Sequence, residues 1–251
     1  MRRLLRALVW RHAFRGKSRA INAFERAASA LGSQGPLSVW LNGFPLELDM
    51  RLAAHRDMYY GLYEEAEVRF MLRCLRPDSV LFDVGAAGGY YVARAAEVIG
   101  TQGSIHCFEP LPTSFELLQG RVATAELRAS VVLNPVAVSD RSGECTIEAD
   151  GGRTRLGQAQ GLPLLQAAAG TRSKECHAVE ATTLDDYVRQ RRLGRVDFIK
   201  LDVEGHELAA LMGFGACFER GLRPALLTEV RWDTPVEQRK ALFSYLGSFG
   251  Y

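Results

Sequence analysis

The sequence has few cysteines and no spacing that pairs them. Its five cysteines are scattered over 251 residues, none of them lies in a Cys-x-x-Cys pair, and their number is odd. A disulfide framework and a zinc site both need paired or clustered thiols, so neither is expected. The chain is therefore predicted to work in a reducing compartment, the cytoplasm, and without a metal site.

The sequence also lacks an apolar run long enough for a transmembrane span or a secretory signal. Its first part is basic instead: residues 1–26 contain eight Arg or Lys and one Glu, whereas the remainder carries 23 basic and 28 acidic residues. Nucleic acid is not expected as a partner, because the basic charge stops at residue 26 and no aromatic stacking platform follows.

Helical spacing within this basic segment separates apolar residues (Met1, Leu4, Leu5, Leu8, Val9) from arginines (Arg2, Arg3, Arg6). The pattern predicts a basic amphipathic helix with two alternative roles. Either it lies on an anionic membrane surface at the cytoplasmic face, or it packs on the domain as a lid.

The chain divides into three predicted parts: a basic helical segment (1–35), a hairpin with a helix (36–78), and a main domain (79–251). The hairpin is predicted from Asn42-Gly43, the strongest two-residue turn signal, between two apolar runs. The main domain contains an insertion at 140–182, in which 143–149 and 175–181 have strand character. The insertion is expected to contact substrate or to be disordered.

Apolar strands and amphipathic helices alternate along the main domain, which predicts a mostly parallel sheet with helices on both faces. The predicted strands are 79–84, 104–108, 130–137, 196–202 and 224–230, and the predicted helices are 90–99, 112–122, 205–212 and 235–248. Ligands bind at the carboxyl ends of such strands. Four acidic residues lie at or just past these ends and are expected to meet in one crevice: Asp83, Glu109, Asp202 and Glu229.

The first predicted strand ends in a carboxylate, Asp83, followed by a glycine turn that opens a helix. A carboxylate there would repel the pyrophosphate of a dinucleotide but would attract the ammonium group of S-adenosylmethionine. The third small residue of the dinucleotide fingerprint is also absent, since Tyr90 stands at that position. The turn therefore indicates a methyl-donor site, and the alternatives are a nicotinamide site or a tight turn without a ligand.

Glu109 ends the next predicted strand, twenty residues beyond the turn. An acidic residue at this distance is placed to accept hydrogen bonds from both ribose hydroxyls of a nucleoside. The structural alternative is a solvated charge at a strand end.

A second cluster, Asp202, Glu204, His206 and Glu207, follows the fourth predicted strand. Asp202 and Glu204 alternate and point the same way, and so many titratable groups at a crevice mouth predict catalytic chemistry. The structural alternatives, which are less favoured, are a helix-capping carboxylate for Glu207 and a surface residue for His206.

Over about residues 60–251 the sequence resembles the FkbM-type family of S-adenosylmethionine-dependent methyltransferases. The resemblance is carried by six motifs: Tyr63-Glu64, Asp83-Val84-Gly85-Ala86, Phe108-Glu109-Pro110, Asn134 with Ala137-Val138-Ser139-Asp140, Thr183-Leu184-Asp185, and Lys200 to Glu207. It implies a class I, Rossmann-like methyltransferase fold and O-methylation of a sugar or polyketide hydroxyl, with a small-molecule or glycan acceptor.

The resemblance also implies roles for individual residues. Asp83, Gly85, Ala86 and Gly89 would form the turn around the methionine part of the cofactor. Glu109 would hold the ribose, and Val138 with Ser139 would border the adenine. Asp202 would lie near the methionine ammonium or the acceptor hydroxyl.

A neutral sugar hydroxyl must lose its proton as the methyl group is transferred. His206 is the first candidate for this base because its proton affinity lies nearest neutral pH, with Glu204 or Asp202 orienting it or replacing it. A magnesium ion held by Asp202 and Glu204 is a lesser alternative.

Two departures from the family pattern point to a different class of function. Ala87 stands where family members commonly have Asn, and the final two strands of a class I sheet are apparently absent. The strand ending at Glu229 would then be an edge that a partner or the hairpin covers, unless the sequence is truncated. The alternatives to an active methyltransferase are a degenerate binding or membrane-docking module without activity and, less favoured because of Asp83 and Tyr90, a nicotinamide-dependent oxidoreductase.

Overall fold

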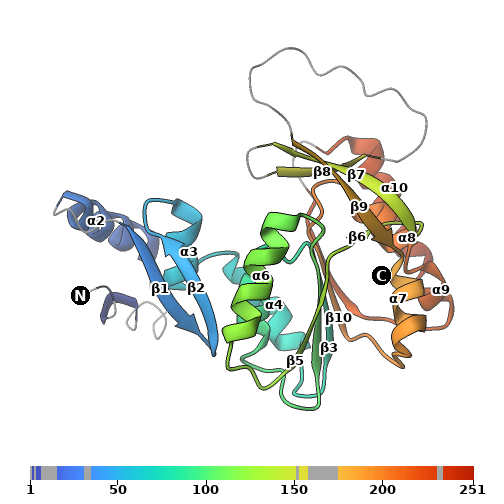
Figure 1. Cartoon of the computed structure of the whole chain (residues 1–251), viewed down its shortest axis with the longest axis horizontal. Helices are drawn as coiled ribbons and strands as arrows, with labels where there is room; N and C mark the ends of the chain where they lie inside the picture. The colour runs from blue at the N-terminus through green and yellow to red at the C-terminus, as the bar shows by residue number, and fades with distance from the viewer. Residues whose placement is uncertain are drawn as a thin grey trace, which may run out of the picture.

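A five-stranded parallel sheet forms the centre of the molecule (Figure 1). The computed structural model describes residues 2, 4–6, 16–30, 35–150, 153–157, 175–230 and 234–251. The strand order is β11 (Ala225–Thr228), β10 (Phe198–Leu201), β3 (Val80–Val84), β4 (Ser104–Phe108) and β5 (Ser130–Asn134). All four pairings are parallel, as the sequence predicts.

Helices cover both faces of this sheet, because its strands are apolar on both sides. Leu81 faces the layer of α4 (Glu65–Cys74), α5 (Tyr90–Ala95) and α6 (Pro112–Thr124), whereas Phe82 faces the opposite layer. The second layer consists of α7 (Leu184–Arg191), α8 (Glu207–Met212), α9 (Gly215–Glu219) and α10 (Val236–Ser248). Figure 1 shows the two helical layers on either side of the strands.

The predicted strand 130–137 is interrupted in the structure. Its first part is β5, and its last residues form β6 (Ala137–Val138), which pairs with β9 (Glu175–Thr182) in another sheet. Pro135 lies between them, and proline lacks the N–H that would continue the ladder. The chain therefore changes sheets at this proline.

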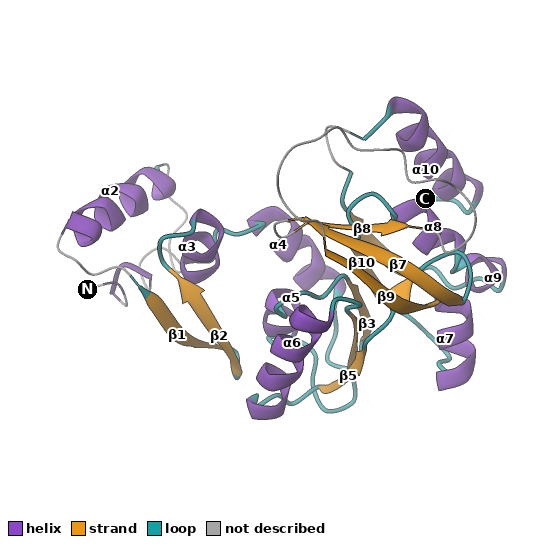
Figure 2. Cartoon of the chain, turned by 45° about the horizontal axis from the view of Figure 1, so that its top comes forward, coloured by secondary structure: helices purple, strands orange, loops and turns teal. Residues whose placement is uncertain are grey.

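The second sheet contains most of the described insertion, in the order β6-β9-β7-β8. Figure 2 shows its strands β9, β7 and β8 side by side. The two predicted strands are confirmed as β7 (Gly143–Asp150) and β9, which pair antiparallel. The sequence did not predict β8 (Arg153–Gly157), whose glycine-rich surroundings lack strand alternation. Residues 151–152 and 158–174 of the insertion lie outside the described residues.

The amino-terminal part projects from the main domain and includes α2 (Lys17–Ala30), the hairpin β1 (Pro36–Leu41) and β2 (Phe44–Asp49), and α3 (Ala53–Tyr60). The Asn42-Gly43 turn has positive φ at both residues, 52° and 82°, as a type I′ turn requires. The Gly43 carbonyl accepts a hydrogen bond from the Glu126 N–H at 2.7 Å, and Asn42 donates to the Ala93 carbonyl at 2.9 Å. The hairpin thus packs near α5 and α6 and does not cover β11.

Only part of the predicted basic helix is described, namely helical residues at positions 2 and 4–6. Arg2 forms an ion pair with Glu25 of α2 at 2.9 Å, and the Arg6 guanidinium lies 5.0 Å from the centre of the Tyr59 ring. Contact with a membrane surface remains a prediction. Among the described residues, no helix has the length and apolar character needed to span a bilayer.

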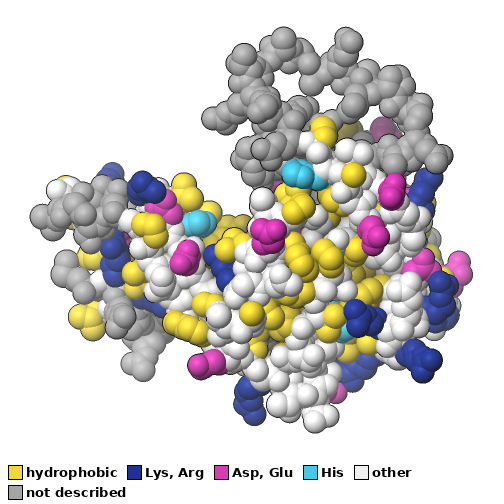
Figure 3. All heavy atoms as spheres, in the orientation of Figure 1, with side chains coloured by type: hydrophobic (Ala, Val, Ile, Leu, Met, Phe, Trp, Pro, Cys, Tyr) yellow, Lys and Arg dark blue, Asp and Glu magenta, His cyan; other side chains and the backbone are white. Residues whose placement is uncertain are grey.

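Figure 3 shows a band of apolar side chains across the middle of the main domain on one face, with acidic side chains along its upper border.

The motif Thr183-Leu184-Asp185 has a structural role in the main domain. The Thr183 hydroxyl caps α7 by accepting from the Asp186 N–H at 3.0 Å. The Asp185 carboxylate accepts from the N–H groups of Ala216 and Cys217 in α9.

Candidate functional site

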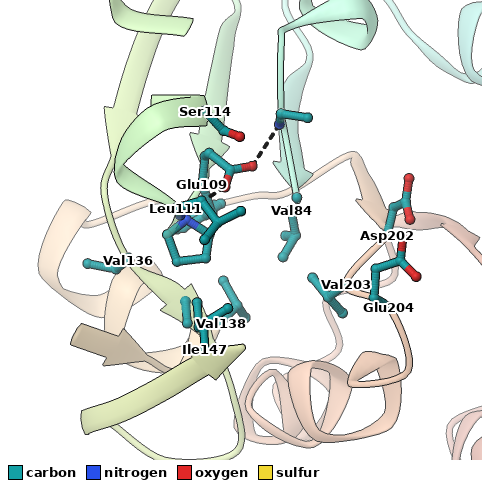
Figure 4. A pocket seen from close by; sticks show the side chains of 15 residues that line it. Val84, Glu109, Leu111, Ser114, Val136, Val138, Ile147, Asp202, Val203 and Glu204 are labelled. Carbon is teal, nitrogen blue, oxygen red and sulfur yellow. Dashed lines mark hydrogen bonds between the residues drawn. The ribbon is translucent and has the colours of Figure 1, made fainter. Parts of the chain in front are cut away.

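A pocket opens at the carboxyl ends of the central strands (Figure 4). Including its open mouth, it has a volume of about 780 Å³. Most of its lining residues come from the turn after β3, the end of β4 with the loop after it, β6 with the residue before it, and the loop after β10. Ser114 of α6 and Ile147 of β7 complete the lining. This is the edge of the sheet at which the sequence predicts a ligand.

The turn after β3 is tied to both neighbouring strands. The N–H groups of Gly85 and Ala86 donate to the Phe108 carbonyl at 2.9 and 3.1 Å. A Cβ on Gly85, whose φ is 80°, would collide with the Asp202 carbonyl. The turn therefore needs glycine here, and the close approach places Gly85 and Ala87 in the pocket wall. Ala86 and Gly89 do not line the pocket; a Cβ on Gly89 would instead meet the Phe44 ring.

Glu109 lines the pocket and is only 6% exposed. Its carboxylate accepts hydrogen bonds from the Ala87 N–H at 2.8 Å and the Leu111 N–H at 2.9 Å. Burial raises the pKa of Glu109, and these two backbone hydrogen bonds oppose the increase. Each oxygen keeps a second lone pair for a ligand hydroxyl.

Asp83 is fully buried behind the pocket wall and is not one of the pocket-lining residues. Its Oδ1 lies 3.5 Å from the Nζ of Lys200, which also lies 3.3 Å from Oδ2 of Asp202. Burial raises the pKa of the Asp83 carboxyl, and the Lys200 ammonium opposes this. Burial alone would lower the pKa of Lys200, but the two carboxylates outweigh it and raise that pKa.

The sequence analysis gave no role to Tyr91 or to Lys200, although Lys200 opens the motif that ends at Glu207. The Lys200 ammonium lies 4.7 Å from the centre of the Tyr91 ring, and the Tyr91 hydroxyl donates to Glu64 at 2.5 Å. A signal was present in the sequence, because Lys200 interrupts the apolar run of β10 and a lysine in a buried strand requires acidic partners.

Asp202 and Glu204 both line the pocket, on the side opposite Glu109 in Figure 4. Glu204 has a φ of 54°, a left-handed conformation that a non-glycine residue rarely adopts. Glu207 stabilises this loop, since its Oε1 accepts from the N–H groups of Val203 and Gly205 at 3.2 and 3.0 Å. Glu207 therefore holds the loop that precedes α8, whose first turn has no side-chain cap hydrogen bond.

His206 does not line the pocket. Its Nε2 lies 2.9 Å from the Ser139 Oγ, which donates to the Asp140 carboxylate at 3.1 Å. Burial lowers the pKa of His206, and Asp140 opposes this change. Val138 lines the pocket, whereas its neighbour Ser139 contacts His206. The predicted site residues Ser139 and His206 thus lie together beside the pocket rather than in its lining.

Of the four strand-end carboxylates expected in one crevice, Glu109 and Asp202 line the pocket, Asp83 lies behind it, and Glu229 is not among its lining residues. The part of the chain that the structure describes contains no group of three or more His, Cys, Asp or Glu arranged to hold a metal ion.

Comparison with known proteins places this site in a family. Residues 83–251 match the model of the methyltransferase FkbM domain. A curated relative, the hexuronic acid methyltransferase AglP of Haloferax volcanii, is 26% identical over 153 residues, which is 60% of this chain and 56% of the relative. The match therefore spans about half the length of that relative.

Two solved structures have similar backbones. An S-adenosylmethionine-dependent O-methyltransferase from Thermotoga maritima has a TM-score of 0.42 and 14% identity, covering 74% of this chain and 50% of its own. Fibrillarin from Aeropyrum pernix, solved with S-adenosylmethionine bound, has a TM-score of 0.42 and 17% identity, covering 74% and 64%.

The parallel sheet, its strand order and its two helical layers are those of the class I methyltransferase fold that the sequence predicts. The family match extends over more than half of the chain and includes the pocket-forming turns after β3, β4 and β10. The chain belongs to the FkbM methyltransferase domain family.

Proposed function

We propose that this protein is an S-adenosylmethionine-dependent O-methyltransferase that acts on a hydroxyl group of a sugar, either free or within a glycan or glycolipid. The observation that carries the proposal is the pocket at the ends of β3, β4 and β10 in a chain of the FkbM family. The curated relative named for a hexuronic acid supports the sugar class of acceptor.

The residues present fit S-adenosylmethionine. The glycine turn at Gly85 lies directly against the backbone of Asp202, and a Cβ on Gly85 would collide with the Asp202 carbonyl. Each Glu109 oxygen keeps a lone pair that would accept a hydrogen bond from a ribose hydroxyl. The apolar side chains that line the pocket offer a surface for the adenine ring; they are Phe108, Val136, Val138 and Ile147. No phosphate-binding group is needed for this donor, in keeping with the acidic lining of the pocket.

Accordingly, Glu109 would hold the ribose, Val138 with its apolar neighbours would hold the adenine, and the Gly85 turn with Asp202 would hold the methionine end. Asp83 would act on that end from behind the wall, through its charge. When bound, S-adenosylmethionine supplies an electrophilic methyl group on sulfur. The contribution of the protein is to hold the acceptor oxygen in line with it and to remove the proton.

We favour Glu204 as the general base. Its carboxylate belongs to the pocket lining, and its left-handed backbone is the kind of local strain that is found at functional sites. His206 is the second candidate: its Nε2 is engaged by Ser139, so it would have to act from beside the pocket. Ile147 of β7 shows that the insertion reaches the pocket, which supports the expectation that the insertion contacts the acceptor.

The test is a methyl-transfer assay with labelled S-adenosylmethionine and a panel of uronic-acid, neutral-sugar and polyketide hydroxyl acceptors. Labelled product with a sugar acceptor, lost in E204Q, supports the proposal. Cofactor binding without transfer to any acceptor would favour the degenerate binding module instead.

A further inference from the structure

Lys200 is the only lysine of β10, and its ammonium is enclosed behind the cofactor pocket. The side chain is 7% exposed. Its Nζ donates to the Gly85 carbonyl at 3.2 Å and lies within 3.5 Å of carboxylate oxygens of both Asp83 and Asp202. A single ammonium thus joins the end of β3, the glycine turn and the loop after β10.

Strand pairing explains this arrangement. β10 and β3 are parallel neighbours in which Lys200 is directly opposite Asp83, so both side chains project from the same face of the sheet. Gly85 and Asp202 are pocket-lining residues, whereas Lys200 and Asp83 are not. Lys200 therefore contacts two parts of the pocket wall from the side that the ligand does not reach.

The charges around this ammonium do not balance. Groups from every neighbouring element face Asp83 or Lys200: Asp202 after β10, Glu64 before α4, Tyr91 of α5, Cys107 of β4 and Glu109 after β4. Lys200 is the one cation among these groups, against the carboxylates of Asp83, Asp202, Glu64 and Glu109. A cationic ligand group at the wall would reduce this excess of negative charge.

We propose that Lys200 is a positioning residue for the methyl donor, which holds the Gly85 carbonyl and the Asp202 carboxylate in place and acts as the internal counter-ion of Asp83. The inference rests on the proposed function, because it assigns this cluster to the cationic amino-acid end of S-adenosylmethionine. Tyr91 and Glu64 form the outer part of the same cluster, with the Tyr91 ring beneath the ammonium and its hydroxyl bonded to Glu64.

Two ligands separate this role from a merely structural one. S-Adenosylhomocysteine carries the amino-acid end, whereas 5′-methylthioadenosine has the same nucleoside and thioether without it. In K200M we expect affinity for S-adenosylhomocysteine, measured by titration calorimetry, to fall by about tenfold or more, and affinity for methylthioadenosine to change by less than about twofold. K240M is the matched control, since Lys240 is an exposed lysine of α10 that pairs with Glu237, and it should leave both affinities unchanged.

The pH dependence provides a second readout. Without its counter-ion, the buried Asp83 carboxyl should bind a proton more readily, so the S-adenosylhomocysteine affinity of K200M should fall more steeply than that of the wild type as the pH is lowered. The wild type and K200R, which keeps the positive charge, should show a flatter profile. If K200M does not fold, K200Q provides the same comparison while keeping a donor for the Gly85 carbonyl.

Equal losses for both ligands, or no loss for S-adenosylhomocysteine, would overturn the role of Lys200 while leaving the proposed function in place. A folded wild-type protein that binds neither ligand would overturn the proposed function and this inference together.

Discussion

The Glu109 carboxylate accepts a hydrogen bond from the backbone N–H of Ala87 at 2.8 Å, which ties the end of β4 to the glycine turn after β3. One side chain thus serves the fold and the site together. It closes the turn that forms one wall of the pocket, and it belongs to the pocket lining itself (Figure 4).

Replacing Glu109 should therefore weaken both stability and cofactor binding. We expect E109A to reduce the binding free energy of S-adenosylhomocysteine by about 1–3 kcal/mol, through lost hydrogen bonds to the ribose, and to lower the thermal midpoint because the Ala87 and Leu111 amides lose their acceptor. Titration calorimetry and thermal unfolding measure the two effects. Affinity equal to wild type would remove Glu109 from the ribose site.

Replacing Ala87 by asparagine should raise the stability of the protein, whereas E109A should lower it. Its φ of 44° is strained for alanine, whereas asparagine tolerates this left-handed conformation, and the side chain is exposed. A87N should raise the free energy of unfolding by about 0.5–1 kcal/mol in urea titrations. A86G is the matched control, because the buried neighbour Ala86 does not have positive φ, and this change should destabilise the protein. A lower free energy of unfolding for A87N would show that the backbone of Ala87 is not strained.

His106 predicts a stability that falls in mild acid. It is 4% exposed on β4, with Nδ1 2.8 Å from the Tyr187 hydroxyl and Nε2 3.0 Å from Ser104 Oγ. Burial lowers its pKa to about 4. The unfolded chain binds a proton below pH 6.5 or so, whereas the folded chain does so only below about 4, so stability is lost as the pH falls through this window.

The contribution of His106 over this window is about 2–3 kcal/mol. Because carboxylates titrate in the same range, the informative quantity is the difference between wild type and H106Q in unfolding free energy, measured at several pH values between about 7 and 4. That difference should shift in favour of H106Q as the pH falls. Parallel curves would show that His106 does not remain neutral in the fold.

The two candidate bases are distinguished by turnover. We expect E204Q to lower kcat by about a hundredfold or more while S-adenosylhomocysteine affinity stays within about twofold, as loss of proton abstraction requires. H206N should lower kcat by less than about tenfold, because it removes a group that lies beside the pocket and bonds Ser139. The reverse ranking of the two variants would assign the base to His206.

The central sheet could be predicted from the sequence because its strands are short, mostly apolar runs that alternate with helical segments. Local signals also sufficed for the hairpin, whose Asn42-Gly43 turn has one favourable geometry. The strand predicted over 130–137 was wrong in its last part, where Pro135 ends the pairing. The short helix α9 depends on capping by Asp185, a residue distant in sequence, and therefore has little local signal.

For the site, sequence position predicted which loops meet but not which side chains face the pocket. Asp83 and Asp202 both stand at strand ends, yet the register of β10 against β3 places Lys200 beside Asp83 and turns that carboxylate into a buried partner. The contact between His206 and Ser139 likewise joins two loops that are remote in the chain. Such pairings follow from tertiary packing, which motif spacing does not encode.

The most direct test of the account is titration calorimetry of the folded wild-type protein with S-adenosylhomocysteine, and with NAD in a parallel titration. The account predicts micromolar affinity for S-adenosylhomocysteine and no binding of NAD, because the pocket is lined by Glu109, Asp202 and Glu204. A folded sample that binds NAD, or that does not bind S-adenosylhomocysteine, would contradict it.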